Sequence, residues 1–234
     1  MEKIDGLETD ISGTASDLLK TAHARRGYAL SYHRMFAAHA PDLLAAYDAY
    51  YRELTLRPRT LSPGAKETVW IALQAATREH HGMIHLRRAE QAGLSREAIA
   101  DALALAAAAE AWPVLQFGDD HWRAWTPIEA AVPRYLRIFE AARGGVDAAV
   151  AEITAVVCHA ARRTHAAERL HIGRAFRAGA TAPMLAEALG FLLLPAGGPC
   201  LIDAVQAWAT AHEADPATVP SPYEENPAAS SNPP

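Results

Sequence analysis

Cysteine is scarce in this chain of 234 residues, since only Cys158 and Cys200 are present, 42 positions apart. Two distant cysteines make neither a disulfide scaffold nor a local redox pair, and they fit a reducing compartment. The first ten residues, MEKIDGLETD, also lack the basic start and the apolar run of a secretory signal. We therefore expect a cytoplasmic protein.

A strong positive charge and long apolar runs are also missing. The formal net charge is −5, so the chain offers phosphate backbones no broad attractive field, and we expect no nucleic-acid partner. The longest apolar stretches, 98–109 and 189–201, are shorter than the roughly 20 residues that span a bilayer, and we expect no membrane segment. The sequence contains no glycine-rich nucleotide motif and no nucleophile elbow.

Alanine is abundant while aromatic residues make up only 7% of the chain. Alanine is the best helix former, helix-start signals such as Ser62-Pro63 recur, and no stretch alternates long enough to predict a strand. The sequence therefore predicts an all-α protein. We expect a flexible arm over 1–15, a first helical unit with N-terminal helices over 16–125, a second, degenerate unit over 126–214 and a disordered, proline-rich tail over 215–234.

The two units are predicted from an internal repeat. A shift of 86 residues places 66–122 on 152–208 without a gap, with 13 of the 57 positions identical. The identities include His85 on His171, Gly93 on Gly179 and Trp122 on Trp208. A histidine, a helix-ending glycine and a tryptophan in one register indicate two tandem copies of one helical unit.

The polar cluster richest in candidate catalytic groups is Arg78-Glu79-His80-His81-Gly82-Met83-Ile84-His85. On a continuous helix, His81 and His85 share a face, and Arg78 joins it. Histidine moves protons near neutral pH, and arginine holds carboxylates, so this face is a candidate catalytic stripe. The alternatives are a solvated helix face or a buried histidine with a structural partner.

In the second copy, His165, Glu168 and His171 fall on roughly one helix face. This set could hold a metal or be a surface pair, and we predict no metal site. Glu67 and Glu152 lie early in the helices that precede the two clusters. Each could orient a histidine, or could only stabilise its helix through the favourable interaction of a carboxylate with the helix dipole.

Residues 61–113 resemble the carboxymuconolactone decarboxylase and AhpD-type alkylhydroperoxidase superfamily. The resemblance rests on the leading Leu-Ser-Pro, the early glutamate, the histidine before Ala-Gly and the closing Ala111-Trp112-Pro113. It implies an AhpD-like helical fold and a homo-oligomer, which for a two-copy chain is expected to be a trimer. Arg78 and His81 stand where peroxidase members carry their two cysteines, so the resemblance points to the cysteine-free branch and away from a thiol peroxidase.

The function expected from this resemblance is that of a cofactor-independent lyase (a decarboxylase) or isomerase, acting on a small carboxylated or lactone-like organic acid. His85 is the predicted general acid and base, with His81 assisting and Glu67 orienting a histidine. Substrate binding is assigned to a second set of residues, namely Arg78, His80 and Trp112. In the second copy the candidates are His171, Glu152 and His165. The alternatives are a metal-dependent enzyme using His81 and His85, and a non-catalytic ligand-binding paralogue.

Overall fold

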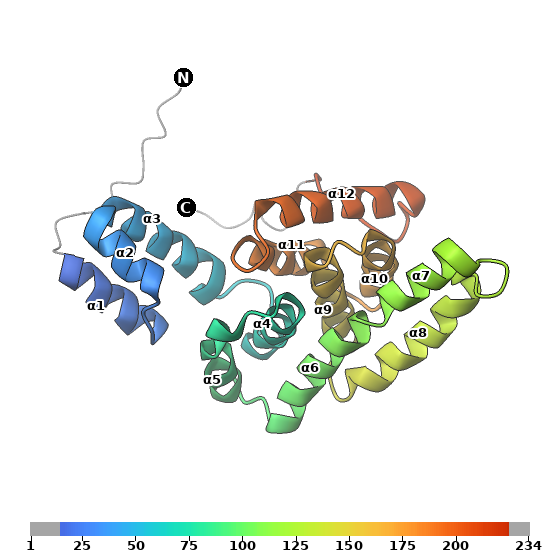
Figure 1. The fold of residues 1–234 in the computed structure, drawn as a ribbon, viewed down its shortest axis with the longest axis horizontal. Helices are drawn as coiled ribbons and strands as arrows, with labels where there is room; N and C mark the ends of the chain where they lie inside the picture. Colours follow the sequence, from blue (N-terminus) through green and yellow to red (C-terminus); the bar gives the residue numbers. More distant parts are fainter. Residues whose placement is uncertain (1–14, 225–234) are drawn as a thin grey trace, which may run out of the picture. The chain divides into compact units, whose positions relative to one another are not determined.

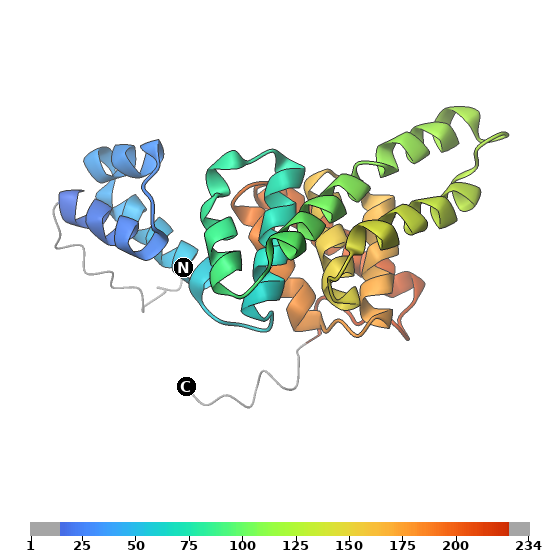
Figure 2. The same ribbon diagram turned by 90° about the horizontal axis from the view of Figure 1, so that it is seen from below.

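The computed structural model describes residues 15–224 and contains no strand among them. Its contacts divide the chain into two compact units, with the boundary between Arg57 and Pro58. The all-α architecture predicted from the sequence is confirmed, and it is consistent with an AhpD-like helical fold. Figures 1 and 2 show the helices of both units in two views.

The first unit consists of three short helices and a π-helical turn. These are α1 (Ala15–Arg26), α2 (Ser31–His39), α3 (Pro41–Tyr51) and η1 (Arg52–Leu56). Its core is polar, because the fully buried Arg26 donates to Asp48 and lies 4.0 Å from the ring centroid of Tyr51. Asp48 compensates the buried charge, so Arg26 ties α1 to α3.

The second unit begins with α4 (Pro63–Thr77), η2 (His80–Gly82), α5 (Ile84–Gln91), α6 (Arg96–Ala109) and α7 (Trp112–Trp122). It continues with α8 (Ile128–Arg143), α9 (Ala148–Ala161), α10 (His165–Arg177), α11 (Ala182–Gly190), η3 (Phe191–Leu193) and α12 (Gly198–Ala214). Helices α4 and α9 pack against each other, and α6 lies against both, so this trio forms the centre of the unit. Helices α7 and α8 run side by side as a hairpin (Figures 1 and 2).

Small side chains hold the central helices together. Ala72 and Ala76 of α4, Ala106 and Ala109 of α6, and Cys158 of α9 form one buried cluster. Side chains of this size let helix backbones approach closely, which explains the alanine-rich composition. Burial raises the pKa of the Cys158 thiol to about 12, so this thiol stays protonated near neutral pH.

The predicted repeat at 86 residues concerns helices that lie in this single unit. Helices α4, α5, α6 and α7, moved by 86 positions, overlap α9, α10, α11 with η3, and α12. The contact boundary at Arg57 does not address that division, so the tandem copies and the boundary at residue 126 stay predictions.

The chain ends differ partly from expectation. Most of the predicted arm and residues 225–234 lie outside the described residues. The start of the predicted disordered tail is ordered, because Trp208 Nε1 donates to the Pro220 carbonyl at 2.9 Å and Val219 is buried. The hydrogen bond from Trp208 and the burial of Val219 fix this part of the chain against α12.

The expected absence of a membrane segment stays a prediction. Residues Arg96–Trp122 form a 27-residue helical stretch that is long and apolar enough to cross a membrane by length and composition, and 33% of its apolar 18-residue window is buried. Its first part, α6, packs against α4, α8 and α9, as a core helix of a soluble protein also does.

Candidate functional site

The residues of the predicted stripe do not share one helix face. Helix α4 ends at Thr77, and Arg78 adopts the left-handed conformation with φ 61°, so the chain turns through η2 before α5 begins. The expectation of a continuous helix over 78–85 is therefore wrong. Its cause is the stop at Arg78, which local spacing did not reveal.

This break separates the stripe into an exposed and a buried part. His80 and His81 are exposed and their rings are in contact, with centroids 4.0 Å apart and planes tilted by 38°. Arg78 is exposed and pairs with Glu110 at 2.9 Å. His85, by contrast, is only 3% exposed.

Buried His85 is paired with Glu67, since its Nδ1 lies 2.7 Å from Glu67 Oε2. Its ring stacks on Trp70, with centroids 4.5 Å apart and planes inclined by 22°. Burial lowers the pKa of His85, although the neighbouring Glu67 carboxylate partly opposes this shift. The ring is therefore neutral near neutral pH and is oriented by a carboxylate, as a general base requires.

The indole N–H of Trp70, beside this histidine, is a hydrogen-bond donor without an acceptor among the described residues. Its indole is 2% exposed and lies between the rings of His85 and Phe191. Within residues 15–224 the buried Trp70 Nε1 has no hydrogen-bond partner. A buried N–H without a partner costs about 1–3 kcal/mol, so this donor is available to an acceptor from outside the chain.

A cavity of about 410 Å³ lies next to the turn. Arg78, Glu79 and His80 line it together with the apolar side chains of Ile71, Leu86 and Leu103. Two predicted substrate-binding residues, Arg78 and His80, thus share a cavity. His85 does not line it, and the third predicted binder, Trp112, is buried elsewhere, 3% exposed and edge-on to Tyr135.

The second predicted copy contains a longer hydrogen-bonded network. His171 Nδ1 lies 2.6 Å from Glu152 Oε2, and Arg174 donates to the other carboxylate oxygen at 2.7 Å. On the far side of the ring, His171 Nε2 lies 2.7 Å from the Tyr135 hydroxyl. That hydroxyl also meets His159 Nε2, at 2.8 Å.

This network is enclosed in the helical core. Tyr135, His159 and His171 are each 0% exposed, and Glu152 is 3% exposed. Burial is the main reason why the pKa values of both histidines are lowered, and His159 is also disfavoured as a cation by His171. Both imidazoles are therefore neutral near neutral pH.

Neutral rings give the network a single direction. Glu152 pairs with Arg174 as a carboxylate, which can only accept, so His171 donates from Nδ1 and accepts at Nε2 from Tyr135. The phenol oxygen then accepts from His159 Nε2, which leaves His159 Nδ1 as an acceptor. Every hydrogen bond of the network therefore has its donor on the side away from Glu152 and its acceptor on the side nearer to it.

Sequence reasoning named His171 and Glu152 but missed Tyr135 and His159. They lie 36 and 12 residues before His171 on α8 and α9, so no helix-face spacing links them to it. His165, the remaining second-copy candidate, is outside the network, and its Nδ1 lies 3.0 Å from Glu168 Oε2.

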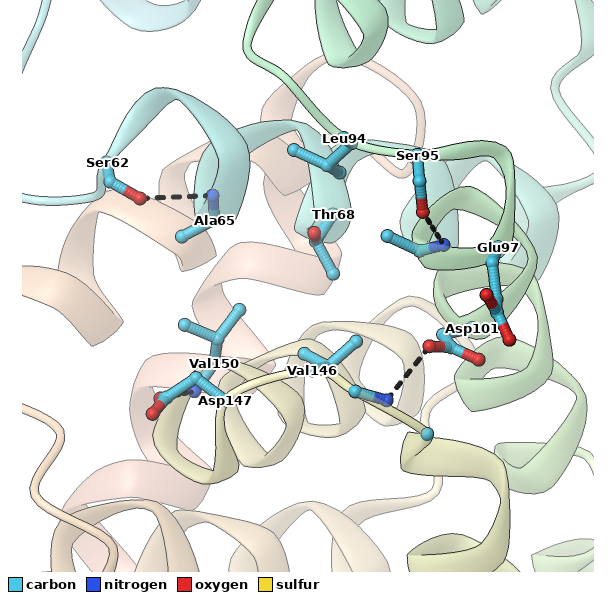
Figure 3. A pocket seen from close by; sticks show the side chains of 13 residues that line it. Ser62, Ala65, Thr68, Leu94, Ser95, Glu97, Asp101, Val146, Asp147 and Val150 are labelled. Atoms are coloured by element: carbon cyan, nitrogen blue, oxygen red, sulfur yellow. Dashed lines mark hydrogen bonds between the residues drawn. The ribbon is translucent and has the colours of Figure 1, made fainter.

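Another cavity, of about 690 Å³, has none of these histidines in its lining. Figure 3 shows three of its polar side chains bonded to backbone groups, since Ser62 and Ser95 cap α4 and α6 and Asp101 accepts from Gly145 N at 3.0 Å. No histidine or cation lines it. These groups stabilise helix starts and a turn, which is a structural role.

A metal can be held by one group among the described residues. Ligand atoms of Glu79, His80 and His81 lie within 4.8 Å of one another on the exposed turn. The predicted metal alternative used His81 with His85, but His85 is bound to Glu67. The structure thus groups His81 with its neighbours on the turn.

The sequence model of the carboxymuconolactone decarboxylase family matches residues 41–118 of this chain, about a third of its length. The matched region includes the Glu67–His85 pair and ends before Tyr135. No curated protein and no solved structure matches the chain. The family match supports membership of the superfamily and a decarboxylase-like or AhpD-like function at the level of the family.

Proposed function

We propose that this protein is a cofactor-independent lyase, a decarboxylase, or an isomerase that acts on a small carboxylated or lactone-like organic acid. The observation that carries the proposal is the buried Glu67–His85 pair inside the family-matched region. A neutral imidazole whose Nδ1–H is held by a carboxylate keeps Nε2 free to take a proton. Glu67 would then stabilise the imidazolium that forms.

The groups around His85 support chemistry that develops negative charge. Loss of carbon dioxide, or of a proton next to a carbonyl, leaves an enolate oxygen that needs donors. The unpartnered Trp70 Nε1 beside the His85 ring is one such donor. The neighbouring cavity, with Arg78 and His80 at its polar end, would hold the carboxylate, and His81 would assist from the exposed turn.

The experiment is a turnover assay on a panel of aromatic-derived lactones and carboxylic acids. We expect His85→Asn to lower kcat at least about 100-fold and Glu67→Gln to lower it less, because one removes the base and the other its orienter. His23→Asn, on the exposed face of α1, is the matched control. Wild-type kcat in a folded His85→Asn protein contradicts the assignment, and binding without turnover favours the ligand-binding alternative.

A metal-dependent reaction is the second candidate, because of the Glu79, His80 and His81 group. Elemental analysis of the purified protein tests it, with a His80→Ala/His81→Ala double variant as the control. A stoichiometric metal that the double variant loses supports this candidate. Full turnover of a substrate by metal-free protein excludes it.

We also propose a homo-oligomer, with the trimer as the expected state. Its support is the apolar surface of the α7–α8 hairpin, where Val114 is 70%, Trp122 56% and Trp125 87% exposed. Exposed apolar side chains in this number are typical of association surfaces. Light scattering tests the proposal, and a monomer at working concentration contradicts it.

A further inference from the structure

A separate cavity of about 390 Å³ lies between α7 and the start of α10. Trp112 and Phe117 contribute aromatic surface from α7, and Arg163, Thr164 and His165 line the opposite wall. A volume of this order suits a small organic molecule. The cavity lies outside the region that carries the Glu67–His85 pair.

The cationic side chain that lines this cavity is Arg163. The acidic residue in the lining, Asp120, already accepts from Gln116 at 2.9 Å, and His121 and His165 add ring nitrogens. Arg163 lies 3.7 Å from Asp203 and also interacts with the Cys200 thiol, and its side chain is 55% exposed. Its guanidinium can therefore turn to a carboxylate, which it binds in a bidentate manner.

Thr164 connects the cavity to the buried network. It lines the cavity, and its Oγ1 lies 2.7 Å from His159 Nδ1. The other acceptor near this hydroxyl, the His159 carbonyl, is more distant at 3.3 Å. Because His159 Nδ1 is the open acceptor of the network, Thr164 donates to it.

We propose that this cavity binds a small aromatic carboxylate that also carries a ring hydroxyl, and that the chain from Thr164 through His159, Tyr135 and His171 to Glu152 takes the proton of that hydroxyl. Trp112 and Phe117 would contact the ring, and Arg163 would hold the carboxylate. An arginine side chain is much longer than that of threonine, so the two groups can reach opposite ends of one ring.

The proton transfer balances without any other reactant. The ligand's O–H bond breaks and its proton bonds to Thr164 Oγ1, while the threonine proton moves to His159 Nδ1. The His159 Nε2 proton moves to Tyr135, the phenol proton to His171 Nε2, and the His171 Nδ1 proton to Glu152. The ligand, already a carboxylate, gains a second negative charge and Glu152 becomes a carboxylic acid, while each intermediate group keeps its original charge.

The charged and titratable groups that face this chain are few. Arg174 and Glu140 stand at the Glu152 end, where Arg174 pairs with both carboxylates. Arg162 and Cys158 lie near His159 and Tyr135, respectively.

The binding test uses 4-hydroxy-3-nitrobenzoate, a carboxylic acid whose phenol turns yellow when it loses its proton. We expect saturable binding to the full-length protein by calorimetry, weakened at least tenfold in Arg163→Gln. Arg137→Gln, an exposed arginine of α8 that donates to the Pro133 carbonyl, is the matched control and should bind like the wild type. No saturable binding, or equal affinity in Arg163→Gln, overturns the proposal.

The proton test compares the absorbance of bound probe across pH. Bound to the wild type, the probe should turn yellow at a lower pH than when free. Thr164→Val should bind it without that shift, because only the hydroxyl is lost, and Thr164→Ser should restore the shift. Thr210→Val, at a threonine of α12 whose hydroxyl donates to the Gln206 carbonyl at 3.0 Å, controls for the substitution itself.

The outcomes separate this proposal from that for His85. An unchanged shift in a folded Thr164→Val protein overturns the relay. His85→Asn should leave both binding and shift unaltered, so loss of turnover there says nothing against this cavity. If His85→Asn abolishes binding of the probe, the site is not the one inferred.

Discussion

Removing one oxygen atom from the core tests the buried network most directly. In Tyr135→Phe the ring keeps its edge-on contact with Trp112, at 5.1 Å between centroids, and only the hydroxyl is lost. That hydroxyl is the shared partner of His159 Nε2 and His171 Nε2, at 2.8 and 2.7 Å. The substitution therefore leaves two fully buried ring nitrogens without partners.

The two imidazoles cannot satisfy each other. Their rings are stacked, with planes inclined by 17° and centroids 5.3 Å apart, whereas an N–H···N bond lies close to the ring plane. Each orphaned group costs about 1–3 kcal/mol, so we expect a loss of about 2–5 kcal/mol in the free energy of unfolding. For a unit of this size that lowers Tm by about 5–15 °C.

The assay is thermal unfolding followed by circular dichroism, with Tyr223→Phe as the control because that side chain is 70% exposed. A second arm adds His159→Leu to Tyr135→Phe. The double variant should lose less than the sum of the two single losses, because each change removes a partner of the other. A Tyr135→Phe protein that melts within about 2 °C of the wild type refutes the hydrogen-bonded network.

Three further substitutions or conditions have defined outcomes. Burial raises the pKa of Glu168 to about 7 from 4.5, so the free energy of unfolding falls as pH rises from 4.5 through 7. In urea unfolding, Glu168→Gln should therefore be more stable than the wild type by up to about 3 kcal/mol at pH 8, but not at pH 4. Burial lowers the pKa of His33 to about 4 from 6.5, so residues 15–57 should lose up to about 3 kcal/mol of stability as pH falls from 6.5 to 4. Faster hydrogen exchange in that unit would report this loss, and His33→Gln should remove its pH dependence. Arg78→Gln breaks an exposed pair with Glu110 and an exposed hydrogen bond to the Ala75 carbonyl, so the free energy of unfolding should change by less than about 1 kcal/mol. If Arg78 binds substrate, KM should rise while kcat stays unchanged.

The fold class was predictable from local signals. Ser62 caps α4 by accepting from Ala65 N, and Pro63 occupies its first turn, as the sequence indicated. Glu67 and Glu152, each named as an orienter of a histidine, lie 2.7 and 2.6 Å from His85 and His171. Such pairs can be anticipated because the two partners lie on consecutive helices joined by a short turn.

What local spacing could not supply were contacts across helices. Tyr135 meets His159 and His171 from α8, which lies between the two aligned segments 66–122 and 152–208, so the repeat pairs it with no residue. The stop of α4 at Arg78 was hidden for another reason. A positive φ is uncommon for arginine, so its side chain gave no signal of the left-handed conformation that separates His81 from His85.

The distribution of polar groups bears on the prediction that the second copy is degenerate. In the alignment at 86 residues, Thr164 and Ala167 stand opposite Arg78 and His81, so the candidate cluster is not repeated there. Yet Thr164 Oγ1 is bonded to His159 and begins a chain of five groups that ends at Glu152. The predicted first copy has a single His–Glu pair and, among the described residues, an unpartnered Trp70 N–H. Keeping several buried polar groups satisfied requires many matched positions, so the predicted second copy has the more constrained core.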